Sequence, residues 1–299
     1  IDCFGIHLDV PIIAAPMPDV CNGDMAMALH NSGALGIIHR FQSIEEQVTE
    51  YAQYQPSHNG NRACAIGVGT DYKERTIELY QAGCRIFCID TANGANEQVG
   101  VVVRWIKDTY KDIYVIAGNV ATKETYYYLA GLGVDAVRVG IGGGAVCETR
   151  TETGIYMPMV TAIEDAVLGR ISIALKNTVD KLREANDVEL ARLEKLVTEN
   201  TTTHKPVLDY IEKHPLFTEN IKNAPLIIAD GGIKTPSDMC KALALGADLV
   251  MCGSIFAGTE ESPGNVVNIE GKLVKLYRGA ASFGVQAEHF DKEPDYVEG

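Results

Sequence analysis

Cys147 lies near the end of a glycine-rich segment that could give its thiol a chemical role. The segment reads G-I-G-G-G-A-V-C-E-T-R from residue 140 to residue 150 and follows an apolar run that we expect to be a strand. Its glycines let the backbone turn tightly and leave amides and carbonyls free to hold a phosphate or a bare cation. A thiol held there can act as a nucleophile, and the Thr149 hydroxyl could orient water or relay a proton. The alternative is a buried core cysteine beside a phosphate-binding turn.

Residues suited to ligand binding follow the ends of the other apolar runs. They are Met17, Arg40, Gly69, Asp90, Asn93, Gly94, Asn119, Asp230, Gly231, Gly232, Gly253 and Ser254. Three of them have a simpler alternative, since Asp230 could be a turn residue, Asn119 could cap the following helix and Met17 could be core packing. Together they predict one polar, glycine-rich face that binds a phosphate-bearing ligand.

The elements that must position these residues alternate between short apolar runs and longer amphipathic runs. Strands are predicted at 11–16, 35–39, 63–68, 85–90, 113–117, 136–139, 226–229 and 249–252. Helices are predicted at 44–54, 72–82, 97–110, 123–132 and 237–245, with N-caps among Ser43, Asp71, Thr122 and Thr235 and with Gly83, Gly133 or Gly246 after their ends. Strands that are apolar on both faces and separated by helices indicate a parallel sheet covered by helices. We therefore predict an α/β fold, a (β/α)8 TIM barrel, whose working groups cluster after the strand ends.

Composition and charge narrow the class of protein. The 299 residues are 46% hydrophobic and can bury one large core, and single α/β barrels run at about 250 residues, so we expect one domain over 1–299. A net charge of −14 argues against a nucleic-acid surface, which needs clustered Lys and Arg. The eight cysteines show no C-x-x-C pair and no metal-ligand pattern with His, which indicates reduced thiols and a cytoplasmic protein. No apolar run approaches the roughly 20 residues of a membrane helix.

The stretch 171–223 is longer than the link expected between the sixth and seventh strands. It is rich in charged residues and carries apolar residues at helix-like spacing, namely Ile171, Leu175, Val179, Leu182, Leu193 and Leu196. We predict an inserted helical segment that is either a solvated hairpin or a subunit contact. The chain starts at Ile1 rather than Met and stops at Gly299 before any recognisable eighth helix, so we expect an incomplete C-terminal end of the barrel.

Several sequence blocks, in one order along the chain, resemble the IMP dehydrogenase and GMP reductase family. The blocks are P-I-I-A-A-P-M at 11–17, G-I-I-H-R-F at 36–41, D-T-A-N-G at 90–94, A-G-N-V at 117–120, the Cys147 segment, A-D-G-G-I at 229–233, A-G-T-E-E-S-P-G at 257–264 and Y-R-G-A-A-S at 277–282. The resemblance covers nearly the whole chain apart from the segment around 170–222. It implies an oxidoreductase that acts on a purine 5'-monophosphate with a nicotinamide cofactor, as a homo-oligomer that is a tetramer in the family.

The resemblance also implies a role for each matched residue. Cys147 would attack C2 of the purine and form a covalent thioimidate-type intermediate, with Thr149 and Glu261 at the positions of a proton relay. The substrate would be bound by Met17, Asp230, Gly231, Gly232, Gly253, Ser254, Tyr277, Gly279, Ala280 and Ala281, and the cofactor by Asp90, Thr91, Asn119 and Arg138. Asp230 would take the ribose hydroxyls. Backbone at 231–232 and 253–254, with the Tyr277 hydroxyl, would take the 5'-phosphate.

Two further points concern a cation and Glu261. The carbonyls of Gly142, Gly144 and Cys147 match a potassium-binding turn of the dehydrogenase branch, so K+ is a candidate ligand. From the residues alone, Glu261 beside Glu260 is better explained as a solvated charge in an acidic loop.

The choice between the two branches of the family depends on a few blocks. I-H-R-F, A-N-G at 92–94, Glu261 and the final Y-V-E-G resemble the reductases, and no Arg-Tyr pair follows Ser282 to act as a hydrolytic base. Arg138 and Y-R-G at 277–279 resemble the dehydrogenases, which also carry A-G-T-E-E. We predict GMP reductase, which converts GMP to IMP and ammonia with NADPH. The alternatives are IMP dehydrogenase, which converts IMP to XMP with NAD, and a catalytically silent nucleotide-binding barrel.

Three departures from the family pattern predict altered substrate recognition. Ala145 stands where the family has a phosphate-binding serine, Ala280 where a methionine touches the base, and Met159 where glutamine follows the proline. The regulatory pair of domains common in the dehydrogenases does not fit within residues 54–61, although some dehydrogenases lack those domains.

Overall fold

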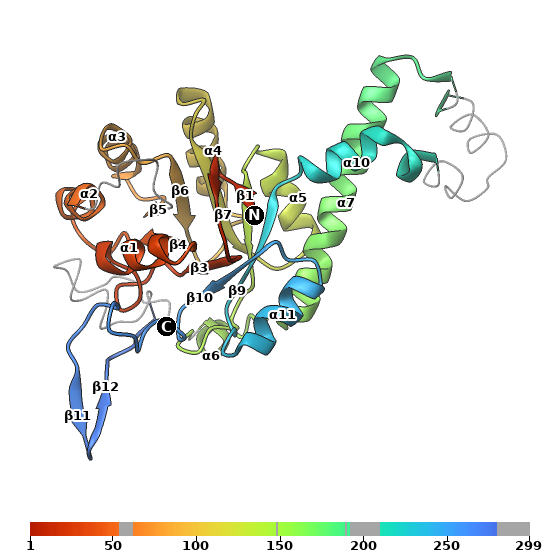
Figure 1. The fold of residues 1–299 in the computed structure, drawn as a ribbon. Helices are drawn as coiled ribbons and strands as arrows, with labels where there is room; N and C mark the ends of the chain where they lie inside the picture. The colour runs from red at the N-terminus through yellow and green to blue at the C-terminus, as the bar shows by residue number, and fades with distance from the viewer. Residues whose placement is uncertain (54–61, 148, 189, 192–209, 280–299) are drawn as a thin grey trace.

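Eight parallel strands close into a barrel because the last of them pairs with the first (Figure 1). A computed structural model describes residues 1–53, 62–147, 149–188, 190–191 and 210–279. The strands are β3 (Ile12–Ala14), β4 (Leu35–Ile38), β5 (Arg62–Ile66), β6 (Ile86–Asp90), β7 (Tyr114–Val120), β8 (Ala136–Val139), β9 (Leu226–Asp230) and β10 (Leu249–Cys252). Val250 of β10 pairs with Ile12 of β3, which closes the ring. The predicted (β/α)8 TIM barrel is confirmed.

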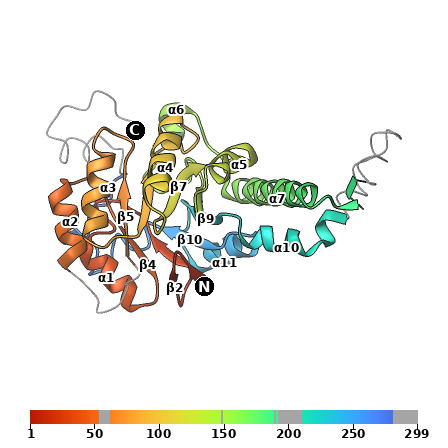
Figure 2. The ribbon, with the colours of Figure 1, turned by 90° about the horizontal axis from the view of Figure 1, so that it is seen from above.

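Helices cover the outside of the barrel, as the view from above shows (Figure 2). They are α1 (Gly23–Asn31), α2 (Ile44–Gln53), α3 (Tyr72–Gln81), α4 (Glu97–Thr109), α5 (Lys123–Gly131), α7 (Met159–Glu184) and α11 (Pro236–Ala244). Thr122 and Thr235 each form a capping box at the start of α5 and α11, as their sequence positions predict. Asp71 lies at the N-cap of α3 but makes no capping bond, because its carboxylate accepts a hydrogen bond from Arg75 instead.

The core has two layers on the two faces of the strands. One layer fills the barrel interior with residues such as Ile13, Leu35, Ile116 and Met251, all at most 1% exposed. The other lies between the strands and the helices. Burial on both faces explains why the strands appear in the sequence as continuous apolar runs rather than alternating ones.

The predicted insertion between the sixth and seventh barrel strands is present as a helical arm that projects from the barrel (Figures 1 and 2). It is formed by the C-terminal part of α7 and by α10 (Pro215–Lys222). The helix does not start near Ile171 as expected, since α7 runs without a break from the barrel wall into the arm. Leu182, Leu190 and Ile211 form a separate small core there. The part of the insertion at 192–209, with Leu193 and Leu196, lies outside the described residues.

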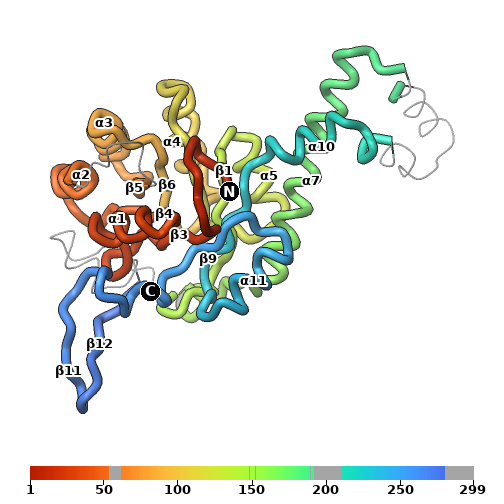
Figure 3. Tube along the Cα trace, in the orientation of Figure 1, coloured from red at the N-terminus to blue at the C-terminus, as the bar shows by residue number. Residues whose placement is uncertain are grey.

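Two short antiparallel hairpins flank the barrel. One is β1 (Asp2–Cys3) with β2 (Ile6–His7), and the other is β11 (Val267–Ile269) with β12 (Lys272–Val274). The second hairpin extends away from the barrel on the side opposite to the α7–α10 arm (Figure 3). The expected gap at the eighth helix concerns residues 280–299, which lie outside the described part of the chain. Within the described residues, no helix is long and apolar enough to cross a membrane.

Candidate active site

A cavity of about 470 Å³ lies at the C-terminal ends of the barrel strands and collects most of the predicted site residues. Those that line it are Met17, Asp90, Thr91, Asn119, Arg138, Gly142, Gly144, Cys147, Thr149, Asp230, Gly231, Gly232, Gly253, Ser254, Tyr277 and Gly279. Ala280 and Ala281 lie outside the described residues. The strand register puts these residues together, because the carboxyl ends of parallel barrel strands meet at one face.

Cys147 is the one of the eight cysteines that lines this cavity. Its thiol donates a hydrogen bond to the Thr149 hydroxyl at 3.3 Å, and its amide donates to the Gly144 carbonyl at 3.2 Å. Thr149 opens the short helix α6 (Thr149–Thr153) directly after the loop. Because Cys147 is half-buried at the cavity wall, it is not the buried core cysteine of the alternative hypothesis.

Two glycine turns approach each other at the cavity wall. Gly231 and Gly232 have φ values of 102° and 75°, in the left-handed region that favours glycine. A Cβ added at Gly231 would lie 3.2 Å from the Gly144 amide nitrogen, and one at Gly232 would lie 3.1 Å from the Gly143 carbonyl. The close approach leaves backbone groups of both turns facing the cavity, as a phosphate site requires.

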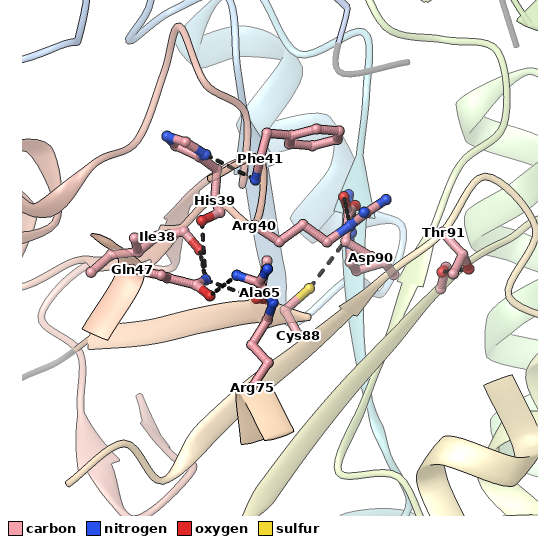
Figure 4. Close-up of polar contacts among 12 residues, drawn as sticks. Ile38, His39, Arg40, Phe41, Gln47, Ala65, Arg75, Cys88, Asp90 and Thr91 are labelled. Atoms are coloured by element: carbon pink, nitrogen blue, oxygen red, sulfur yellow. Dashed lines mark hydrogen bonds and ion pairs between the residues drawn. The ribbon is translucent and has the colours of Figure 1, made fainter. Parts of the chain in front are cut away.

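A chain of buried ion pairs crosses the floor of the cavity. Arg138 Nη1 lies 2.7 Å from Asp90 Oδ1, and Arg138 Nη2 lies 2.8 Å from Asp230 Oδ2. Asn119 Nδ2 also donates to Asp230 Oδ2 at 2.8 Å. Arg40 Nε lies 3.5 Å from the other Asp90 oxygen (Figure 4). Two arginines therefore balance two carboxylates.

The electrostatics of these buried ion pairs keep Asp90 and Arg138 charged. Burial alone would raise the pKa of Asp90, but Arg138 and Arg40 beside it hold that pKa below its ordinary value. Burial would lower the pKa of Arg138, but Asp230 and Asp90 raise it well above its usual range. Both groups therefore stay charged at neutral pH. Asn119 joins these ion pairs through its hydrogen bond to Asp230. The N-cap of α5 is Thr122, not Asn119.

A comparison with known protein families shows to which family the chain belongs. The sequence model of the IMP dehydrogenase / GMP reductase domain matches residues 3–175 and 216–298. The chain belongs to the IMP dehydrogenase / GMP reductase family. The stretch between these two segments that the family model leaves unmatched includes the C-terminal part of α7, whereas nearly all of α10 falls within the second matched segment.

Three similar proteins carry the name inosine-5'-monophosphate dehydrogenase. The protein of Chlorobaculum parvum is 38% identical over 224 residues, which is 75% of this chain and 35% of that protein. Those of Staphylococcus epidermidis and Staphylococcus aureus are 36% identical over 241 residues, which is 80% of this chain and 39% of each. The chain therefore spans less than half the length of these members of the family.

Tyr277, which the sequence predicts to bind substrate, lines the cavity next to an ion pair between Arg278 and Asp19. Arg278 donates to Asp19 from its amide, Nε and Nη2, at 2.9, 3.1 and 3.0 Å. The Tyr277 hydroxyl lies 3.9 Å from Met17 Sδ, so Met17 both packs in the core and faces the cavity. Burial, followed by the nearby negative charge of Asp230, raises the pKa of Tyr277 to about 12. The phenol therefore keeps its proton at neutral pH and can donate a hydrogen bond.

Glu261, the third family residue of the expected proton relay, is not brought to the cavity. Its side chain is exposed, and it is absent from the described residues that line the cavity. The loop that carries it is held by Lys275, whose ammonium donates to the carbonyls of Thr259 and Ser262 at 2.7 and 2.6 Å. The structure thus joins Cys147 with Thr149, whereas a relay through Glu261 stays a prediction.

The predicted potassium turn also stays a prediction. The Gly144 carbonyl, one of its three expected ligands, already accepts the Cys147 amide. Within the described residues, no group of three or more His, Cys, Asp or Glu side chains could hold a metal ion. The ligands that the sequence predicts for a monovalent cation here are backbone carbonyls.

The cavity contains further residues to which the sequence assigned no role. They include Phe41, Val146, Ile233 and Met251. Arg40, which the sequence predicts on the ligand-binding face, does line the cavity. The Asp19–Arg278 pair had no signal in the sequence, because the two residues are far apart in the sequence and only the fold brings them together.

Proposed function

We propose that the chain is a purine nucleotide oxidoreductase in which Cys147 is the nucleophile at C2 of a purine 5'-monophosphate. The observation that carries the proposal is the Cys147 thiol, hydrogen-bonded to Thr149 at the wall of a cavity that also holds the two glycine turns and the ion-pair chain. A thiolate can add to C2 once the ring is held, and C2 can then give or receive a hydride.

Different residues of the chain would bind the 5'-phosphate and the ribose of the nucleotide. Backbone amides of the turns at 231–232 and 253–254, with the protonated Tyr277 phenol, suit a 5'-phosphate. Asp230 has one oxygen, Oδ1, that accepts no hydrogen bond within the described residues, and this oxygen suits a ribose hydroxyl. The Thr149 hydroxyl would relay a proton, accepting that of the thiol while passing its own to water or to the leaving group.

A nicotinamide cofactor would supply or accept the hydride when bound. The buried Asn119 Oδ1 has no hydrogen-bond partner within the described residues, and an amide NH₂ such as that of nicotinamide is the donor it lacks. Asp90, Thr91 and Arg138 lie on the same side of the cavity and would help to hold the cofactor.

Two reaction directions are candidates. The names of the similar proteins favour the oxidation of IMP to XMP with NAD. The sequence blocks I-H-R-F and A-N-G favour the reduction of GMP to IMP and ammonia with NADPH. The shared covalent step through Cys147 is common to both. K+ in the Cys147 turn and a homotetramer are parts of the proposal that follow from the family alone, and a cytoplasmic location is a part that follows from the cysteine pattern.

An absorbance assay of reduced nicotinamide decides between the directions. The purified chain is supplied with GMP and NADPH in one arm and with IMP and NAD in the other. Turnover in one arm, lost in Cys147→Ala, supports that direction. Nucleotide binding by calorimetry with turnover in neither arm would make the chain a silent nucleotide-binding barrel and overturn the proposal.

A further inference from the structure

One buried amide holds the ends of two neighbouring barrel strands beside the cavity. Gln47 on α2 is fully buried, and its Nε2 donates to the carbonyls of His39 at 3.0 Å and Ala65 at 2.9 Å. A weaker contact of 3.4 Å reaches the Ile38 carbonyl. Ile38 is the last residue of β4, His39 follows it, and Ala65 is near the end of β5, so one side chain joins both strands at their cavity ends.

Arg75 on α3 fixes the direction in which that amide faces. Its Nη1 donates to Gln47 Oε1 at 2.8 Å, its Nη2 to the Gln42 carbonyl at 3.1 Å and its Nε to Asp71 at 2.8 Å. A guanidinium can only donate, so the Gln47 oxygen must face Arg75 and its NH₂ must face the strand carbonyls. The orientation of Gln47 is therefore determined by Arg75 (Figure 4).

The strand ends held in this way lead directly to Arg40 and Phe41 in the cavity. Figure 4 shows Arg40 extended toward Asp90. Its guanidinium carbon lies 4.6 Å from the centre of the Phe41 ring. The Phe41 amide donates to His39 Nδ1 at 3.2 Å, which sets the turn after β4. The end of β5 also confines Arg40, because a Cβ added at Gly67 would lie 3.3 Å from Arg40 Nη1.

We propose that Gln47 and Arg75 are positioning residues that place Arg40 beside Asp90 in the cavity by holding the ends of β4 and β5. Neither residue lines the cavity, so any effect on a bound molecule must pass through the strand ends. Arg40 and Asp90 lie on the side of the cavity assigned to the cofactor. The nucleotide side, at 231–232, 253–254 and Tyr277, is carried by other strands and segments.

This inference rests on the proposed function for its choice of ligands, and it predicts a selective defect. Gln47→Met removes the amide and keeps a side chain of similar length, whereas Arg75→Lys keeps the charge but cannot reach three separated acceptors. In both variants the KM for the nicotinamide cofactor used by the wild type should rise roughly tenfold, while nucleotide affinity stays within about twofold. A purely structural role would weaken both ligands together or neither.

A double-mutant cycle tests whether the effect passes through Arg40. Arg40→Ala should itself raise the cofactor KM, and adding Gln47→Met to it should change that KM by less than about twofold. Leu79→Ala is the matched control, since Leu79 is a fully buried residue of α3 that does not line the cavity. It should lower thermal stability without the selective rise in KM. Full additivity of Gln47→Met and Arg40→Ala would overturn the proposal.

Hydrogen exchange provides a test that does not depend on activity. In the ligand-free protein, Gln47→Met should speed exchange of the backbone amides at 37–42 and 65–68 by roughly tenfold relative to the other barrel strands. Leu79→Ala should raise exchange without this local excess. If the wild type turns over no nucleotide but the local excess is present, the proposed function fails and the positioning role stands. If exchange at the strand ends is unchanged in Gln47→Met, the positioning role fails whatever the activity.

Discussion

The carboxylate of Asp230, at the end of β9, accepts two hydrogen bonds from the guanidinium of Arg138 on the neighbouring strand β8. Arg138 Nε and Nη2 lie 3.2 and 2.8 Å from the same oxygen, Asp230 Oδ2. The pair is mostly buried, with side chains 7% and 13% exposed. One carboxylate oxygen is thus committed to the barrel, and the other is available to a ligand.

Asp230→Ala should weaken the nucleotide and destabilise the fold together. We expect a loss of about 1.5–3 kcal/mol in nucleotide binding, because a charge-assisted hydrogen bond to ribose disappears. Stability should fall as well, since Arg138 loses one of its two carboxylates. Calorimetry and thermal unfolding measure the two effects.

Asp248→Ala is the matched control for Asp230→Ala. Asp248 pairs with Arg170 and accepts the Ile227 amide at the start of β9, away from the cavity. Its removal should lower stability and leave nucleotide affinity unchanged. An unchanged affinity in Asp230→Ala would refute the role of Asp230 in binding the ribose.

Cys147→Ala should abolish turnover and leave nucleotide binding largely intact, because Asp230 and the glycine turns remain. Mass spectrometry of the wild type with substrate should detect a nucleotide adduct on the peptide that contains Cys147. Cys240→Ala is the control, since Cys240 is exposed on α11 and should tolerate the change. Full activity in Cys147→Ala contradicts covalent catalysis.

Acid should remove the stabilisation that Asp90 provides. The pKa of Asp90 in the folded protein lies below its ordinary value of 3.8, so folding favours the ionised form. Its contribution is present above pH 3.8 and is lost as the pH falls through the folded-state value. The difference in unfolding free energy between wild type and Asp90→Asn should therefore be largest near neutral pH and shrink below pH 3.8. Urea titrations across this range measure it, and a difference that grows in acid would contradict the assignment.

Gly140→Ala should disturb the loop that carries Cys147. Gly140 has a φ of 135°, and a Cβ there would collide with the Asp230 carbonyl oxygen. We expect a stability loss of about 1–3 kcal/mol together with a large loss of turnover. Gly258→Ala is the matched control, because a Cβ at that position meets no atom within 4 Å. Equal stability of the two variants would show that the close approach at Gly140 is unimportant.

The barrel could be predicted from the sequence because its strands are buried on both faces and its helices carry clear end signals. Thr122, Thr235 and the glycines after helices are such signals, and they depend only on local chemistry. Helix α1 was missed because Asn22 and Gly23 resemble a turn, although Asn22 in fact caps the helix. Hairpin β11–β12 was missed because its residues are exposed and show no pattern of burial.

The site was only partly predictable, because some of its contacts depend on the fold and not on local sequence signals. The position of Cys147, Asp90 and Asp230 after strand ends follows from the barrel rule. The ion-pair chain depends on the register of β6, β8 and β9, which no local pattern encodes. Gln47 and Arg75 gave no signal either, because on amphipathic helices they resemble solvent-facing polar residues, whereas the fold buries them.

The unbroken course of α7 from the barrel wall into the arm makes the arm a direct extension of the barrel. The same helix thus belongs to both parts, and the small core around Leu182 and Ile211 packs α10 against it. Val188, 82% exposed at the end of the described part of this arm, offers an attachment point for a spectroscopic label. A label there would report the tumbling of the whole barrel while staying clear of the cavity.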